Sequence, residues 1–237
     1  MEKFNIRSFF IPDETFTVNK KWVRELINGF KAMGVRWALQ TRVDLVDPAI
    51  LEEMAAGGCV YIHYGAESGS QKILDYYQKG ITVQQIKDAF AWTRQVGIET
   101  SATFIIGSPE ETEETAEATI RLAQGLKADY YHFSPLIPLP LSEFYREFKE
   151  QGILKHYRFE EYVKPNIIFK PKYLTEEEIN GYLKMAYNKT IMNPAYVWRR
   201  LWLVIKKADL IALKVLFSGA WWTIRTFIIK RSNGTSN

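Results

Sequence analysis

Acidic, basic and hydroxyl side chains recur in the amino-terminal part of the chain, each time directly after an apolar run. Asp13 and Glu14 follow one run, Arg42 follows a second, and Glu67 and Ser68 follow a third. If these runs are parallel strands, their carboxyl ends meet at one rim, where α/β proteins bind ligands. A ligand there would offer hydroxyl or amino groups to Asp13 and Glu67 and an anionic group to Arg42. The pattern therefore predicts a ligand pocket.

Each of these groups also has a simpler interpretation. Asp13 and Glu14 could only terminate a strand, Arg42 could pair locally with Asp44, and the Glu67-Ser68 pair could cap a helix. An exposed local ion pair contributes little to stability. The repetition of polar groups at five successive strand ends favours the pocket. These ends are 13–14, 40–44, 67–68, 107–110 and 134–136.

Other catalytic patterns are absent from the sequence. It contains no Gly-Lys-Ser/Thr phosphate loop, no dinucleotide glycine fingerprint and no serine elbow. The three histidines lack metal-ligand spacing, and His63 and His132, which fall within predicted strands, are expected to be packed or hydrogen-bonded there. The chemistry of the chain is therefore sought at the rim.

Strand and helix patterns alternate with short links, which predicts parallel β/α units. Helix starts are marked by capping residues such as Asp47 before Pro48, and Thr175 with Glu178. The expected fold is α/β: a partial (β/α) barrel, or an open sheet, of about five parallel strands with a carboxyl-terminal helical extension. The strands are predicted at 4–11, 35–40, 60–64, 98–106 and 130–136, and the main helices at 19–33, 83–96, 112–126, 142–151 and 175–190.

Composition and charge limit the class of protein. The 237 residues are 47% hydrophobic and 24% charged, as in ordinary globular proteins, and the single cysteine, Cys59, fits a reducing cytoplasm. The amino terminus leads directly into a strand pattern, so no signal peptide is expected. The net charge is +4, but residues 198–237 carry eight bases and one acid. Because these bases alternate with apolar residues, nucleic-acid binding is not expected.

Several rim segments, in this order, resemble the radical S-adenosylmethionine (SAM) superfamily, most closely its cobalamin-binding class. They are PDETFTVNKKWV, QTRVDLVDPAILEEMAAGGC, YGAESGSQKIL with KGIT, FIIGSPEETEET and FSPLIPLP. The resemblance covers about residues 4 to 152 and implies a SAM-binding barrel. In that family a [4Fe–4S] cluster donates an electron that cleaves SAM to a 5′-deoxyadenosyl radical.

The resemblance implies a role for each matched position. Asp13 and Glu14 match the motif near the SAM amino group, and Gln40 and Arg42 belong to the strand that faces SAM. Glu67 and Ser68 match the ribose and carboxylate region. The adenine contacts are implied at Ile105, Gly107, Pro135 and Leu136.

Three features depart from the family pattern. Thr103 replaces a frequent glycine, LPLSEFY replaces a proline-glycine-threonine turn, and the three-cysteine loop that holds the cluster is absent, as is the cobalamin domain. Since such a cluster needs several thiolates, Cys59 is expected to be a small buried side chain. We expect the chain to be inactive alone, either as a truncated gene product or as a fragment that acts with a separately encoded amino-terminal part carrying cluster and cobalamin. The alternative is a degenerate, non-catalytic barrel that acts as a membrane-surface or partner-binding module.

The carboxyl-terminal part has a different character. After the partial barrel at 1–152, residues 153–174 are expected to form a linker and residues 175–237 a helical, basic and amphipathic region. The tryptophans and bases of residues 194–231 are typical of a helix that binds a membrane surface. They are equally typical of a helix packed on protein with its basic side chains extended into water. The chain is therefore expected in the cytoplasm, either free or at the inner face of the membrane.

Overall fold

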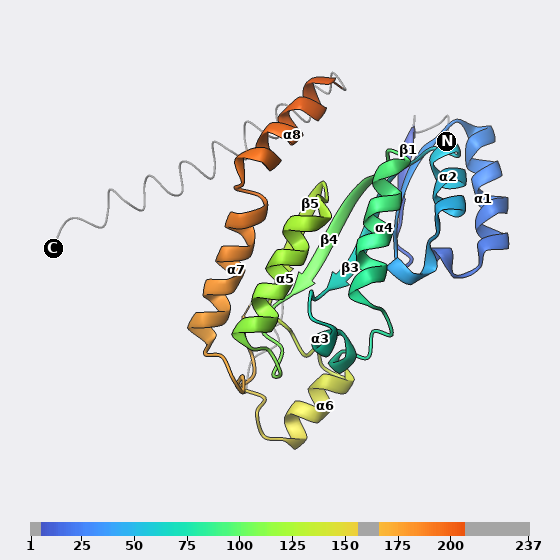
Figure 1. The fold of residues 1–237 in the computed structure, drawn as a ribbon. Helices are drawn as coiled ribbons and strands as arrows, with labels where there is room; N and C mark the ends of the chain where they lie inside the picture. Colours follow the sequence, from blue (N-terminus) through green and yellow to red (C-terminus); the bar gives the residue numbers. More distant parts are fainter. Residues whose placement is uncertain (1–5, 156–165, 207–237) are drawn as a thin grey trace. The chain divides into compact units, whose positions relative to one another are not determined.

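The computed structural model describes residues 6–155 and 166–206 of the chain. Five parallel strands form one open sheet in the order β1-β2-β3-β4-β5 (Figure 1). Because each strand neighbours the next one in sequence, the sheet has the order of a β/α barrel, which confirms the predicted fold class. The strands are β1 Ser8–Ile11, β2 Arg36–Thr41, β3 Cys59–Glu67, β4 Glu99–Ile105 and β5 Tyr130–Ser134.

The helices that connect the strands lie on one face of the sheet (Figure 1). This follows from right-handed crossovers between strands that are adjacent in sequence. Trp37, Leu39, Ile62 and Tyr64 are buried on this face. The connecting helices are α1 Lys20–Met33, α2 Pro48–Ala56, α3 Gln71–Tyr76, α4 Val83–Gln95 and α5 Glu113–Leu126, with short 3-10 turns η2 Phe16–Val18 and η3 Val43–Leu45.

Local capping fixes where the helices begin. The Asp47 side chain accepts a hydrogen bond from the backbone of Ile50 at the start of α2. Thr82 and Thr112 form capping boxes at α4 and α5. The capping box predicted at Thr175 is confirmed at the start of α7 (Glu176–Thr190). These starts were predictable because each depends on residues three or four positions apart.

Strand ends differ from the sequence prediction at three places. β3 was predicted to end near Gly65, but it continues to Glu67, with a shift of register against β4 between these two residues. β5 ends at Ser134, two residues before Leu136. β1 begins at Ser8; the first residues of the predicted strand 4–11 lie partly outside the described residues.

The segment predicted to be a linker contains packed residues. Leu154 pairs with Phe169 in an antiparallel bridge. Ile167 and Phe169 are buried in a cluster with Phe148 of α6 (Glu143–Glu150). The chain divides into two compact units, Met1–Ile191 and Met192–Asn237, and α7 packs against α5 and β5 within the first. The division at residues 152 and 174 remains a prediction.

The described part of the second unit is one helix, α8 (Pro194–Lys206). The remainder of the long helical region expected up to about residue 230 lies outside the described residues. Within the residues that are described, no helix has the length and apolar character that crossing a bilayer requires.

Candidate functional site

Glu67 occupies the last position of β3 in an unusual backbone conformation. Its φ is +61°, in the left-handed region that side chains other than glycine rarely adopt. The buried carboxylate of Glu67 accepts an ion-pair contact from the Lys79 ammonium at 2.8 Å. It lies over Gly65, where an added Cβ would stand 2.5 Å from its Oε1 atom. Gly65 therefore leaves the space that the Glu67 side chain fills.

Arg42 joins this carboxylate through the same lysine. Its Nε and Nη2 atoms bond both oxygens of Asp44, at 2.9 and 3.0 Å, and Nη2 also donates to the backbone oxygen of Lys79 at 2.7 Å. The local ion pair with Asp44, considered above as an alternative, is thus present. We call the connected set of Arg42, Asp44, Glu67 and Lys79 the rim cluster.

Ser68 points toward helix α5. Its buried hydroxyl shares a 3.0 Å hydrogen bond with the Thr119 hydroxyl, which also accepts from the Gly69 backbone at 3.0 Å. The Ser70 backbone donates to Ser68 at 3.1 Å. Glu67 and Ser68 therefore diverge: one carboxylate stands at the rim, while the neighbouring hydroxyl fixes the turn after β3 against α5.

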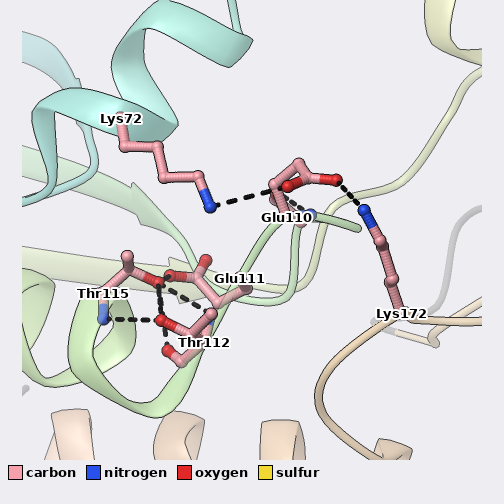
Figure 2. A network of polar contacts seen from close by, with 7 residues as sticks. Lys72, Glu110, Glu111, Thr112, Thr115 and Lys172 are labelled. Carbon is pink, nitrogen blue, oxygen red and sulfur yellow. Dashed lines mark hydrogen bonds and ion pairs between the residues drawn. The ribbon is translucent and has the colours of Figure 1, made fainter.

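The turn after β4 is organised by Glu111, a residue that the sequence analysis did not single out. Gly107, with φ +106°, donates its N–H to Glu111 Oε2 at 3.2 Å. The Thr115 hydroxyl donates to Glu111 Oε1 at 2.5 Å (Figure 2). Burial raises the pKa of Glu111, while the bond from Thr115 opposes the shift. Its place in GSPEE, one residue before the cap Thr112, was the available signal.

Glu110 faces away from Glu111 and bridges two lysines (Figure 2). Its carboxylate contacts Lys72 of α3 at 3.5 Å and Lys172 at 3.0 Å. The hydrogen bond from Lys172 lowers the pKa of Glu110. Lys172 also lies 4.7 Å from the ring centre of Tyr173. This exposed bridge ties the segment before α7 to the turn after β4.

Tyr77, at the end of α3, carries a buried hydroxyl that has no hydrogen-bond partner among the described residues. Burial raises its pKa, and the negative charges of Glu111 and Glu67 add to the shift, so the hydroxyl stays protonated. Ser108 opposes this shift in the pKa of Tyr77, although the two hydroxyls form no hydrogen bond of normal geometry. No pattern in the sequence indicated this orphaned donor.

The apolar residues matched to adenine contacts lie in or beside one cluster. Leu136 is buried with Phe148, Phe169 and Ile179, and Ile105 packs against the same group. The Ile179 side chain fills the space beside Gly107, since an added Cβ there would come within 2.7 Å of it. Pro135 is also buried.

Three predicted polar residues make no hydrogen bond or ion pair with the rim cluster within the described part of the chain: Asp13, Glu14 and Gln40. Asp13 accepts a 2.9 Å hydrogen bond from the Thr15 backbone, and both acids are exposed. Gln40 is half-buried and lies opposite His63 in the register of β2 and β3. The structure therefore brings Arg42 and Glu67 together and leaves the other predicted polar residues separate.

His63 is hydrogen-bonded within the sheet, as expected. Its Nε2 atom lies 3.0 Å from the Thr103 hydroxyl on β4. Burial lowers the pKa of His63, Glu67 raises it and His132 lowers it. Thr103, which departs from the family glycine, thus has a structural partner.

Cys59 lies at the amino end of β3, opposite the rim, and is buried. Burial raises the pKa of its thiol to about 12, so it is protonated at neutral pH and unsuited to bind iron. Residues 6–155 and 166–206 contain no group of three histidine, cysteine or acidic side chains arranged to hold a metal ion. These residues therefore do not fit a [4Fe–4S] cluster.

The comparisons with known proteins decide the family. The radical SAM superfamily profile matches residues 1–123. This chain belongs to the radical SAM superfamily. It is 30% identical over 91% of its length to an uncharacterized methyltransferase of Pyrococcus horikoshii, covering 48% of that protein. It is 33% identical over 81% of its length to the anaerobic magnesium-protoporphyrin IX monomethyl ester cyclase of Cereibacter sphaeroides, covering 32% of it.

A solved structure shows the same fold. The cobalamin- and [4Fe–4S]-bound radical SAM methyltransferase of Kitasatospora setae superposes with a TM-score of 0.58 at 23% identity. The superposition covers 63% of this chain and 31% of that one. The profile and the relatives confirm the resemblance to the radical SAM superfamily, and this cobalamin-bound protein shares the fold of the chain. The chain spans half or less of the length of the relatives it matches.

Proposed function

We propose that this radical SAM chain supplies the SAM-binding rim of an enzyme that performs radical-based methyl transfer or cyclisation. The observation that carries the proposal is the rim cluster, which lies within the span matched by the family profile. The named relatives, a methyltransferase and a cyclase, support the reaction classes.

The rim cluster limits what the ligand offers. Lys79 balances the charge of Glu67, and Asp44 balances that of Arg42, so neither side chain needs a ligand of opposite charge. Glu67 then accepts hydrogen bonds from neutral hydroxyl groups or an amine, as a ribose or the methionine part of SAM would provide. The buried Tyr77 hydroxyl, which has no partner among the described residues, is an additional donor available to the ligand.

SAM binding by the full chain tests the proposal. We expect weak binding in calorimetry or NMR titration, and a loss of about tenfold or more in affinity in Glu67→Gln, because a hydrogen bond to a charged group contributes about 1.5–3 kcal/mol. The matched control is Glu53→Gln, since Glu53 is also ion-paired, with Arg24 at 2.8 Å, but on α2 away from the rim. Equal affinity in both variants, or no binding by the unaltered chain, would contradict the proposal.

We further propose that the [4Fe–4S] cluster and cobalamin are held by a separate part that acts with this chain in the cytoplasm. The argument is chemical: the described residues do not fit the cluster, and the Cys59 thiol stays protonated. Adding a polypeptide with the three-cysteine loop should then strengthen SAM binding.

The alternative is a degenerate barrel that acts, without catalysis, as a membrane-surface or partner-binding module. It is favoured by the same buried thiol and by the ion pairs that already occupy Arg42 and Glu67. The DNA just upstream of Met1 distinguishes the two. A segment there that encodes a three-cysteine loop favours the enzyme, and its absence beside a proper start site favours the binding module.

A further inference from the structure

Helix α8 begins at a well-defined cap. The Asn193 side-chain oxygen accepts a hydrogen bond from the Ala195 backbone N–H at 2.9 Å. The Asn193 backbone oxygen accepts one from the Val197 N–H at 3.1 Å. Pro194 occupies the first helical position, where its fixed φ suits a helix start. The 13 described residues of α8 extend about 20 Å.

One side of α8 carries large apolar side chains in contact with water. Trp198 is 70% exposed, Trp202 58% and Ile205 60%. At about 100° per residue, these three positions fall within about 60° of one another around the helix. We call them the α8 stripe. An exposed stripe of two tryptophans and an isoleucine marks a surface that meets an apolar medium.

The charges on α8 are all positive. Arg199, Arg200 and Lys206 lie in the helix, which has no acidic residue. Residues 198–237 as a whole carry eight bases against the single acid Asp209. An anionic membrane surface attracts clustered bases that have few acidic side chains among them. The charge pattern therefore suits an anionic lipid surface.

We propose that α8 lies in the interfacial region of an anionic bilayer, with the α8 stripe in the acyl-chain boundary. Tryptophan is suited to this depth because its ring is apolar and its indole N–H is polar. Arg199, placed about 100° from Trp198 around the helix, reaches the lipid headgroups. The association anchors the chain to a membrane surface through α8.

Vesicle flotation of the full chain tests this assignment. The vesicles are phosphatidylcholine alone, or phosphatidylcholine with about a quarter phosphatidylglycerol. We expect binding to the anionic vesicles at low salt, weaker binding as salt rises, and a drop of about tenfold or more in the partition coefficient in the double variant Trp198→Ser with Ile205→Ser. Trp198→Phe isolates the emission of Trp198, which should shift to shorter wavelength on binding.

Leu141→Ser is the matched control, because Leu141 is an apolar residue 92% exposed in the first unit. It should bind vesicles like the unaltered chain, and circular dichroism should show equal folding of all variants. Failure to bind anionic vesicles, or equal binding by the double variant, overturns the proposal. Loss of self-association in the double variant, without any vesicle binding, would make the stripe a protein interface and also overturn it.

Discussion

At the scale of single residues, two buried tyrosines differ by one hydrogen bond. The Tyr64 hydroxyl lies 2.9 Å from the Thr93 hydroxyl, whereas that of Tyr77 has no partner among the described residues. Removing a satisfied buried hydroxyl costs about 1 kcal/mol, while removing an orphaned one costs nothing or stabilises the fold. We expect Tyr64→Phe to lower the free energy of unfolding by about that amount and Tyr77→Phe to leave it unchanged or raise it. Urea denaturation measures both.

Equal losses in the two variants would show that the Tyr77 hydroxyl is satisfied in solution, by water or by residues outside those described. The same pair extends to ligand binding. If SAM supplies the missing partner, Tyr77→Phe weakens SAM binding while Tyr64→Phe does not, because the Tyr64 ring packs on Phe90 of α4 and its hydroxyl already bonds Thr93. A reversed order of these effects would remove Tyr77 from the site.

Glu111 gives a second residue-scale prediction, on pH dependence. Burial raises its pKa in the folded chain above the ordinary value of 4.5. The folded state then binds more protons than the unfolded state between these two pKa values, so stability falls as pH rises through that window. Glu111→Gln should flatten this fall. Unfolding free energies measured at pH values from about 4.5 to 7 give the slope.

Glu178 provides the control, because its pKa is shifted in the opposite direction to that of Glu111. Hydrogen bonds from Thr175 lower its pKa, so its contribution to stability is present above its ordinary pKa and is lost as pH falls. Glu178→Gln should therefore change the acidic limb only. A slope above pH 4.5 that is unchanged in Glu111→Gln would show that Glu111 is not buried as described.

At the scale of elements, the turn between β3 and α3 depends on one close approach. A Cβ added to Gly69 would stand 2.3 Å from the Ala118 backbone oxygen of α5. The backbone cannot yield easily, so Gly69→Ala should destabilise the fold by about 1–3 kcal/mol, as measured by denaturant unfolding. Gly125, in the last turn of α5, has no atom within 4 Å of its added Cβ. Gly125→Ala should stabilise the fold by up to about 1 kcal/mol, and a loss equal to that of Gly69→Ala would refute the close approach.

The same elements show what the sequence could predict. Helix starts at Asp47, Thr82, Thr112 and Thr175 follow from short-range capping and were predicted from it. The end of β3 was not, because its last two residues depend on a shifted register against β4. The bridge between Leu154 and Phe169 likewise joins residues with no local signal between them. Short-range chemistry is readable from a sequence, whereas register and packing depend on partners distant in the chain.

At the scale of the whole molecule, the same limit applies to the site. The rim was predicted because parallel strands bring their carboxyl ends together, and Arg42 and Glu67 are linked there through Lys79. Lys79, which connects them, was not predicted, since nothing in its local sequence points to residues 37 positions away. Asp13 and Glu14 were predicted on the same grounds, but in the described contacts they remain apart from the cluster. Strand topology thus locates a site, and tertiary contacts decide its members.

At the scale of the whole molecule the sheet also has an edge at β1. β1 pairs with β2 alone, and within the described residues no strand lies on its other side. Phe10, on this edge strand, is 48% exposed. A parallel edge of this kind pairs with another strand, either from a second copy or from the part that we propose acts with this chain. We expect the chain to self-associate as its concentration rises, and Phe10→Lys to reduce this, because a charge on an edge strand opposes pairing.

Sedimentation velocity over a range of concentrations measures this effect. The comparison is made in the Trp198→Ser, Ile205→Ser background, so that the α8 stripe does not contribute. Val18→Lys is the control, since Val18 is exposed in η2 and lies outside the sheet. A monomer at every concentration, or the same response in both lysine variants, would show that β1 is already protected. If Phe10→Lys reduces self-association and Val18→Lys does not, the edge of β1 is the surface at which a further strand pairs with the sheet.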